Sequence, residues 1–221
     1  MNILSFDTSS EKFSLAIYRK NQIIYYYSRI LKKKYSKYLI PIIKDSLIKV
    51  NMKIKQINVI SISVGPGSFT GIRLGIAAAK GLSMPYNISI LGFSNMDLIM
   101  ESVDNKIKGK NFLILIKGKK NDFYYQLFNS KKRKISNISF FSDYKLPNFK
   151  NFKDIIIIGN FNEKVKNKIK SINKKKFLCF KKKFFSARNL IYLSKVSLLK
   201  KNIKTLEPIY VYDHYAKNFD N

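Results

Sequence analysis

The chain has 221 residues, enough for one larger domain or two small ones, and its hydrophobic content of 46% excludes a disordered polyelectrolyte. A single cysteine excludes an internal disulfide, and the lack of a signal-like N-terminus or of the roughly 20 apolar residues that cross a membrane predicts a cytoplasmic location. The formal net charge is +30, but only five of the 43 basic residues are arginine, which favours A/T-rich codon usage over nucleic-acid binding as its cause.

Short apolar, β-prone runs open the chain and predict three strands joined by tight turns, over residues 2–7, 13–18 and 22–28. The next run, residues 36–51, repeats apolar side chains at intervals of three and four, which predicts an amphipathic helix. There follow a strand over 58–64, a helix over about 70–83, a strand over 88–92 and a helix over 94–103. The β-β-β-α-β-α-β order is typical of a mixed sheet covered by helices, and therefore of an α/β fold.

The rest of the chain is less regular. We expect strands over 112–117, 123–128, 135–141 and 154–159, then a helix over about 186–200 and an irregular tail. A polar stretch near residues 104–110 predicts a boundary between an N-terminal lobe, 1–104, and a smaller C-terminal lobe with its tail, 105–221.

A glycine-rich stretch, VGPGSFTGIRLG at residues 64–75, follows a predicted strand and opens a predicted helix. Gly65 and Gly67 allow a tight turn, and Ser68 or Thr70 can cap the helix. The stretch is not a P-loop, because no Lys-Ser or Lys-Thr pair follows Gly71, and its GxGxxxG spacing departs from the dinucleotide fingerprint. The free N–H groups of such a helix start suit an anion, but a capped turn without a ligand explains the same residues.

Small residues recur along the predicted second helix, where Gly71, Gly75 and Ala79 stand four positions apart. Glycine inside a helix costs about 1 kcal/mol relative to alanine, and it is tolerated where another helix must approach closely. The approaching helix is either the one over 36–51 of the same chain or a helix of another protein.

Four stretches resemble the TsaB (also called YeaZ) family: MNILSFDTSSEKFSLAI, SKYLIPIIKDSLI, SVGPGSFTGIRLGIAAAKGLS and EPIYVYDHYAK, with the strong part over residues 1–100. The resemblance implies an actin/Hsp70/sugar-kinase type of fold with two lobes, the second reduced. It also implies a non-catalytic partner subunit of the complex that forms N6-threonylcarbamoyladenosine at position 37 of tRNAs reading codons that start with A. The implied partners are a catalytic paralogue, TsaD, an ATPase, TsaE, tRNA through the complex, and a second copy of the chain when TsaD is absent.

The resemblance further assigns residues to two sites. The helices over 36–51 and 70–83 would contact the catalytic paralogue, with an interface made of Leu39, Ile43, Leu47, Gly71, Arg73, Gly75 and Ala79. Arg73 could instead pair with a phosphate or an internal carboxylate. A phosphate or nucleotide such as ATP or ADP, bound weakly here or used elsewhere in the complex, would meet Asp7, Thr8, Ser9, Gly65, Gly67 and Ser68. For Asp7 the alternative is a simple turn cap.

The inventory of reactive side chains argues against independent catalysis. One histidine, His214, and one cysteine, Cys179, cannot build a metal centre or a nucleophilic triad, so we expect no metal and no catalytic residue. A phosphotransferase needs carboxylates for magnesium and for a base, and no second carboxylate pairs convincingly with Asp7. An ATP-dependent phosphotransferase or ATPase acting alone is the alternative function. The chain departs from the family at Tyr35, where a histidine is usual.

The basic residues are spread unevenly. Residues 1–100 carry 14 basic and 4 acidic side chains, whereas residues 101–221 carry 29 and 9. If an RNA is bound, the second half is therefore its expected contact, and the affinity should fall as salt rises because phosphate contacts release counterions.

Overall fold

The computed structural model describes residues 1–31, 35–107, 110–118, 121–142, 155–172, 178–181, 185–199 and 206–209. The chain divides into two compact units. The first lobe comprises Met1–Glu101 with the described residues between Phe184 and Ile209, and the second lobe comprises the described residues of Ser102–Lys183. None of the helices in these ranges has the length and hydropathy to cross a membrane.

The first lobe is built on a five-stranded mixed sheet in the order β3-β2-β1-β4-β5. Its strands are β1 (Ile3–Asp7), β2 (Lys12–Arg19), β3 (Gln22–Ile30), β4 (Val59–Ser63) and β5 (Ser89–Phe93). The first three pair antiparallel, whereas β4 and β5 run parallel to β1. The β2–β3 hairpin turns at Lys20 and Asn21, whose φ angles of 48° and 63° fit the twist of a two-residue turn.

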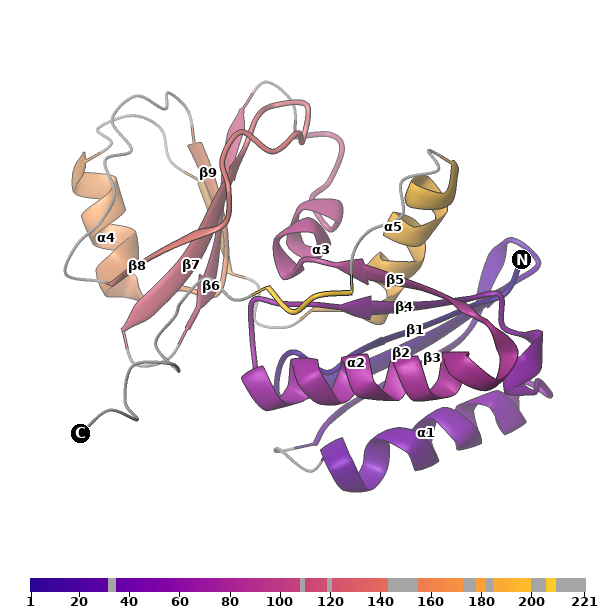
Figure 1. The fold of residues 1–221 in the computed structure, drawn as a ribbon. Helices are drawn as coiled ribbons and strands as arrows, with labels where there is room; N and C mark the ends of the chain where they lie inside the picture. Colours follow the sequence, from indigo (N-terminus) through magenta and orange to yellow (C-terminus); the bar gives the residue numbers. More distant parts are fainter. Residues whose placement is uncertain are drawn as a thin grey trace, which may run out of the picture. The chain divides into compact units, whose positions relative to one another are not determined.

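Helices cover this sheet, as Figure 1 shows. They are α1 (Tyr35–Lys49), α2 (Phe69–Ser83), α3 (Asn95–Glu101) and α5 (Ala187–Leu199), with the short 3₁₀ turns η1 (Ile54–Gln56) and η2 (Met84–Tyr86). The neighbouring helices α1 and α2 lie against one face, and α5 lies on the other face over β1, β2 and β4. The alternation of side chains along a strand therefore gives each face of β1 its own neighbours.

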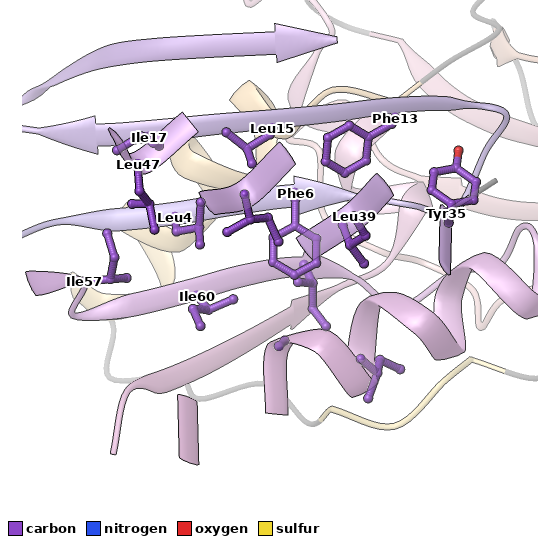
Figure 2. Close-up of a cluster of buried hydrophobic side chains, with 14 of the residues drawn as sticks. Leu4, Phe6, Phe13, Leu15, Ile17, Tyr35, Leu39, Leu47, Ile57 and Ile60 are labelled. Atoms are coloured by element: carbon purple, nitrogen blue, oxygen red, sulfur yellow. The ribbon is translucent and has the colours of Figure 1, made fainter. Parts of the chain in front are cut away.

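The main core lies between the sheet and the pair α1–α2. Leu4 and Phe6 of β1 are buried there together with Leu39 of α1, as the close-up in Figure 2 illustrates. Ile43 of α1 belongs to the same buried cluster. Each such side chain contributes roughly 1.5–3 kcal/mol by leaving water. The intervening Ser5 points to the other face, where its hydroxyl donates to the Ala187 carbonyl at 2.8 Å.

The second lobe repeats the strand order of the first. Its sheet runs β10-β9-β6-β7-β8, so β6 to β10 occupy the places of β1 to β5. The elements are β6 (Asn111–Lys117), β7 (Asp122–Phe128), β8 (Ser139–Ser142), β9 (Ile155–Gly159), β10 (Leu178–Lys181) and α4 (Glu163–Ile172). The buried side chains of α4, Val165 and Ile169, pack with Leu113 and Leu115 of β6. The second lobe has a single long helix among its described residues, which fits the expected reduction.

The predicted α/β fold with two mixed sheets is confirmed, and the duplicated strand order is what the actin/Hsp70/sugar-kinase resemblance implies. One assignment differs from the expected lobes. The helix predicted over 186–200 was placed in the C-terminal lobe, 105–221, but α5 belongs to the first lobe. Hydrogen bonds between residues distant in the sequence hold α5 there: besides the bond from Ser5, the Ala187 N–H donates to the Ser14 hydroxyl at 2.9 Å.

Candidate functional site

Two loops of the first lobe are fastened to each other, and we call this contact the latch. One loop, residues 8–11, joins β1 to β2, and the other, residues 64–68, joins β4 to α2. The Ser68 N–H donates to the Ser9 carbonyl at 2.7 Å. The Thr8 hydroxyl donates to the Gly71 carbonyl at 2.7 Å, inside the first turn of α2. Ser68 also caps α2, because its hydroxyl accepts the Gly71 N–H at 3.3 Å.

The glycines of this region make room for the latch. A Cβ at Gly71 would lie 2.0 Å from the Thr8 carbonyl oxygen, and one at Gly75 would lie 2.4 Å from Thr8 Oγ1. A Cβ at Gly67 would lie 2.4 Å from the carbonyl oxygen of Ser9. Real Cβ atoms do not approach other atoms so closely. The backbone of the first loop therefore requires glycine at positions 67 and 71, whereas at position 75 the close neighbour is the Thr8 side chain.

Asp7 ends β1 beneath the latch and is completely buried. Its Oδ1 accepts the Ser9 N–H at 3.0 Å, the Ser9 hydroxyl at 2.6 Å and the Ser63 hydroxyl of β4. Its Oδ2 has no hydrogen-bond partner among the residues that the structure describes. Burial raises the pKa of Asp7 above its ordinary value, and the bonds from Ser63 and Ser9 oppose this only in part. The bond from the Ser9 N–H is that of an Asp turn cap, which agrees with the simpler of the two expectations for Asp7.

Asn95 joins both loops to the start of α3. Its Nδ2 donates to Ser9 Oγ and to the Pro66 carbonyl, each at 2.8 Å, and its backbone N–H donates to the Gly65 carbonyl at 2.7 Å. Sequence reasoning missed this residue. The only available signal was an amide side chain at the start of a helix that follows a buried strand.

Tyr35 fastens α1 to the same loop. Its hydroxyl donates to the Ser10 carbonyl, and its ring centroid lies 6.4 Å from that of Phe13. Burial raises the pKa of the Tyr35 phenol, and the charges of Asp7 and Glu11 add to the effect. The tyrosine that replaces the usual histidine therefore has a structural role in positioning α1.

The residues expected to contact a phosphate are brought together, but they bond to one another. Gly65 is buried, and the side chains of Asp7, Thr8 and Ser9 are at most 2% exposed. The Ser68 N–H, a donor that an anion at this helix start would use, is taken by Ser9. Gly67 and Ser68 remain exposed. The geometry thus favours the capped turn over an open phosphate site.

Six of the seven residues expected at a partner interface lie in the interior of the first lobe. Leu39, Ile43 and Leu47 are at most 6% exposed, within the core of Figure 2. Gly71, Gly75 and Ala79 are buried as well, and the two glycines face Thr8 of the same chain. At Gly71 and Gly75, Thr8 of the chain's own β1–β2 loop occupies the space where a helix of another protein was expected.

Arg73 is the exception. It is exposed on α2, and its guanidinium carbon lies 3.7 Å from the centroid of the Phe69 ring. Stacking on an aromatic face holds a guanidinium in place while leaving its N–H donors at the rim.

The same two helices expose a second set of side chains, which we call the outer surface. It includes apolar side chains with large exposed fractions: Ile40 (46%) and Ile48 (63%) of α1, and Met84 (81%) of η2, directly after α2. Other exposed side chains of the two helices include Lys44, Arg73 and Ala77. Large apolar groups that remain in water on adjacent helices are typical of a protein contact.

Among the described residues, no group of three or more His, Cys, Asp or Glu side chains is placed to hold a metal ion. His214 and residues 210–212 lie outside the described residues, as do the 119–120 positions.

Comparisons of the sequence and of the fold both find similar proteins among the TsaD, TsaB and YeaZ proteins. The model of the family described as TsaD, tRNA N6-adenosine threonylcarbamoyltransferase, matches residues 27–139, just over half of the chain. A protein of Buchnera aphidicola subsp. Acyrthosiphon pisum, named tRNA threonylcarbamoyladenosine biosynthesis protein TsaB, is 35% identical over 133 residues, 60% of each chain. The Escherichia coli protein of the same name is 26% identical over 125 residues, 57% of this chain and 54% of that one. The matched segment therefore spans little more than half the length of these curated relatives.

The fold also has a solved counterpart. The structure of YeaZ from Pseudomonas aeruginosa superposes with a TM-score of 0.76, over 95% of this chain and 100% of that chain. The sequence identity is 15%, so this likeness concerns the fold.

Proposed function

Because the chain belongs to the family of TsaD proteins and their TsaB (YeaZ) relatives, we propose that it is the partner subunit of a complex that makes N6-threonylcarbamoyladenosine in tRNA. In this role it binds a TsaD-type catalytic subunit and performs no transfer itself. The product forms at position 37 of tRNAs that read codons starting with A, in the cytoplasm, where the tRNA substrate is found.

The observation that carries this proposal is the outer surface of α1 and α2. Apolar side chains such as Ile48 and Met84 project into water there, on helices that are fixed from beneath. Tyr35 fastens α1, and Thr8 and Ser68 fasten α2, to the same β1–β2 loop. A surface held this firmly loses little conformational entropy when a partner binds.

The closed latch supports a non-catalytic role. The groups that would hold a phosphate in this lobe are bonded to one another, and Asp7 is sealed from solvent. We therefore assign any ATP used by the complex to other subunits, including a TsaE-type ATPase. In the absence of the catalytic subunit, the outer surface serves a homodimer.

Reconstitution tests the proposal. The chain is mixed with a TsaD-type protein, a TsaE-type protein, ATP, threonine, bicarbonate, the enzyme that makes the activated threonylcarbamoyl group, and tRNA, and the modified nucleoside is measured after digestion. We expect formation only when this chain is present, and no ATP hydrolysis by the chain alone. Equal modification without the chain would overturn the proposal.

A further inference from the structure

The connection between β7 and β8 contains four consecutive basic residues, Lys131, Lys132, Arg133 and Lys134, which we call the basic turn. Lys131, Arg133 and Lys134 are exposed. No acidic residue occurs between Asp122 and Asp143 in the sequence. It concentrates four positive charges in a single short loop.

The turn is held in one conformation by Asn129. The Asn129 side-chain oxygen accepts the backbone N–H groups of Lys131 and Arg133, each at 3.0 Å. The Asn129 N–H donates to the Arg133 carbonyl at 2.9 Å, and its carbonyl accepts the Lys132 N–H at 2.9 Å. An Asn side chain that bonds the backbone two and four residues ahead gives a compact, defined loop.

Lys132 closes the turn from its other side. Its φ of 59° is left-handed, and its ammonium group donates to the Val103 carbonyl and to Asn105 Oδ1, both at 2.6 Å. The side chain thereby fastens the turn to the segment that begins the second lobe. Lys106, also exposed, lies on that segment, whereas Asp104 offsets one charge there.

Four consecutive basic residues on an ordered turn repel one another, and the lysine-rich composition of the chain does not by itself explain why they are placed there. A/T-rich codon usage spreads lysine over a surface, where like charges separate freely in solvent. Here, hydrogen bonds fix the backbone of a turn that carries four consecutive basic residues, and neighbouring like charges destabilise one another. The repulsion is relieved by a polyanion with closely and regularly spaced charges, such as the phosphate backbone of RNA.

The remainder of the lobe has the same sign of charge. Residues 102–183 carry 23 basic and 5 acidic side chains, whereas residues 1–101 carry 14 and 5. Arg133 is one of five arginines in the chain and brings a fork that binds two oxygens of one phosphate. A field of one sign over the lobe attracts the RNA, and the basic turn gives it fixed contacts.

We propose that the basic turn of the second lobe binds the phosphate backbone of the RNA on which the complex acts. The identification of that RNA as tRNA rests on the proposed function, but the electrostatic contact itself does not. Lys131 and Arg133 supply the contacts, while Asn129 and Lys132 fix the loop that presents them. The contact is to the backbone, so it positions the RNA without reading its sequence.

The test is binding of unmodified tRNA by the full chain at a series of salt concentrations. The variant Lys131→Gln/Arg133→Gln is compared with Lys53→Gln/Lys55→Gln, which removes two exposed charges from the first lobe. The slope of the logarithm of the tRNA binding constant against the logarithm of the salt concentration is negative. We expect this slope to be shallower by about one to two in the basic-turn variant, since each lost phosphate contact removes roughly 0.9. The control should keep the wild-type slope.

Equal slopes in the two variants would overturn the proposal, as would tRNA binding that does not change with salt. Assembly with the TsaD-type protein, measured by mass, separates the two claims. Normal assembly of the basic-turn variant with weakened tRNA binding supports the contact. Unchanged tRNA binding with normal assembly refutes the contact and leaves the proposed function in place.

Discussion

Gly75 offers a quantitative test of the latch. In Gly75→Ala, the new Cβ would lie 2.4 Å from Thr8 Oγ1, and overpacking of this kind costs roughly 1–3 kcal/mol. Alanine also raises helix propensity by about 1 kcal/mol relative to glycine. The net loss in the free energy of unfolding is therefore about 0–2 kcal/mol.

The clashing atom belongs to a flexible side chain, so a second substitution can remove it. Thr8→Ala deletes Oγ1 and its 2.7 Å bond to the Gly71 carbonyl, at a cost of about 1 kcal/mol, and the remaining Cβ would be 3.7 Å from the new methyl group. In the double variant the overpacking disappears while the gain in helix propensity remains. We expect a coupling free energy of roughly 1–3 kcal/mol in the stabilising direction.

Urea unfolding of the four proteins in the cycle measures this coupling. Gly81→Ala is the matched control in the same helix, because nothing lies within 4 Å of its added Cβ, and it should stabilise the protein by up to about 1 kcal/mol. Additive effects of Thr8→Ala and Gly75→Ala, or a Gly75→Ala variant as stable as Gly81→Ala, would refute the close approach of the β1–β2 loop to α2.

Further predictions concern the groups beneath and beside the latch. The pKa of Asp7 is higher in the folded protein than its ordinary value of 3.8, so the folded state keeps a proton that the unfolded state loses. As pH rises from 3.8 toward the folded pKa, the wild type should therefore lose stability relative to Asp7→Asn, by at most about 1.4 kcal/mol per pH unit. Parallel pH profiles of the two proteins would contradict this. Tyr35→Phe should cost about 1–2 kcal/mol in thermal unfolding, because the Ser10 carbonyl loses its donor, and a stability equal to wild type would argue against that bond. Gly159→Ala should destabilise the second lobe by at least about 3 kcal/mol, because the new Cβ would lie 1.8 Å from the Leu115 carbonyl oxygen and because the φ of Gly159, 139°, suits glycine alone. Resistance to proteolysis unchanged from the wild type would exclude this.

The sequence predicted most of the fold because its elements have clear periodicities. The three opening strands, the amphipathic helix from residue 36 and the helix after the glycine stretch were all read from local patterns, and they correspond to β1–β3, α1 and α2. The strand β10 was missed, since its four residues, LCFK, are too few to show an alternating pattern. Local patterns also could not predict that α5 belongs to the first lobe, because hydrogen bonds such as that from Ser5 to Ala187 join residues 182 positions apart.

The candidate site shows more clearly what a sequence pattern cannot predict. Helical spacing correctly identified a stripe of small residues, Gly71, Gly75 and Ala79, but spacing does not say what approaches it. A loop of the same chain approaches, where the sequence suggested a second helix. Leu39 and Ile43 were likewise assigned to an interface because apolar residues on a helix face suit a core and a docking surface equally well.

Substitutions on the outer surface test the central claim most directly. The mass of the mixture with a TsaD-type protein is measured for the wild type, for Ile48→Glu/Ala77→Glu, and for Tyr192→Glu, which changes an exposed side chain on α5. The account predicts a heterodimer for the wild type and for Tyr192→Glu, and separate subunits for the double variant with unchanged thermal stability. A heterodimer that persists in Ile48→Glu/Ala77→Glu would contradict it.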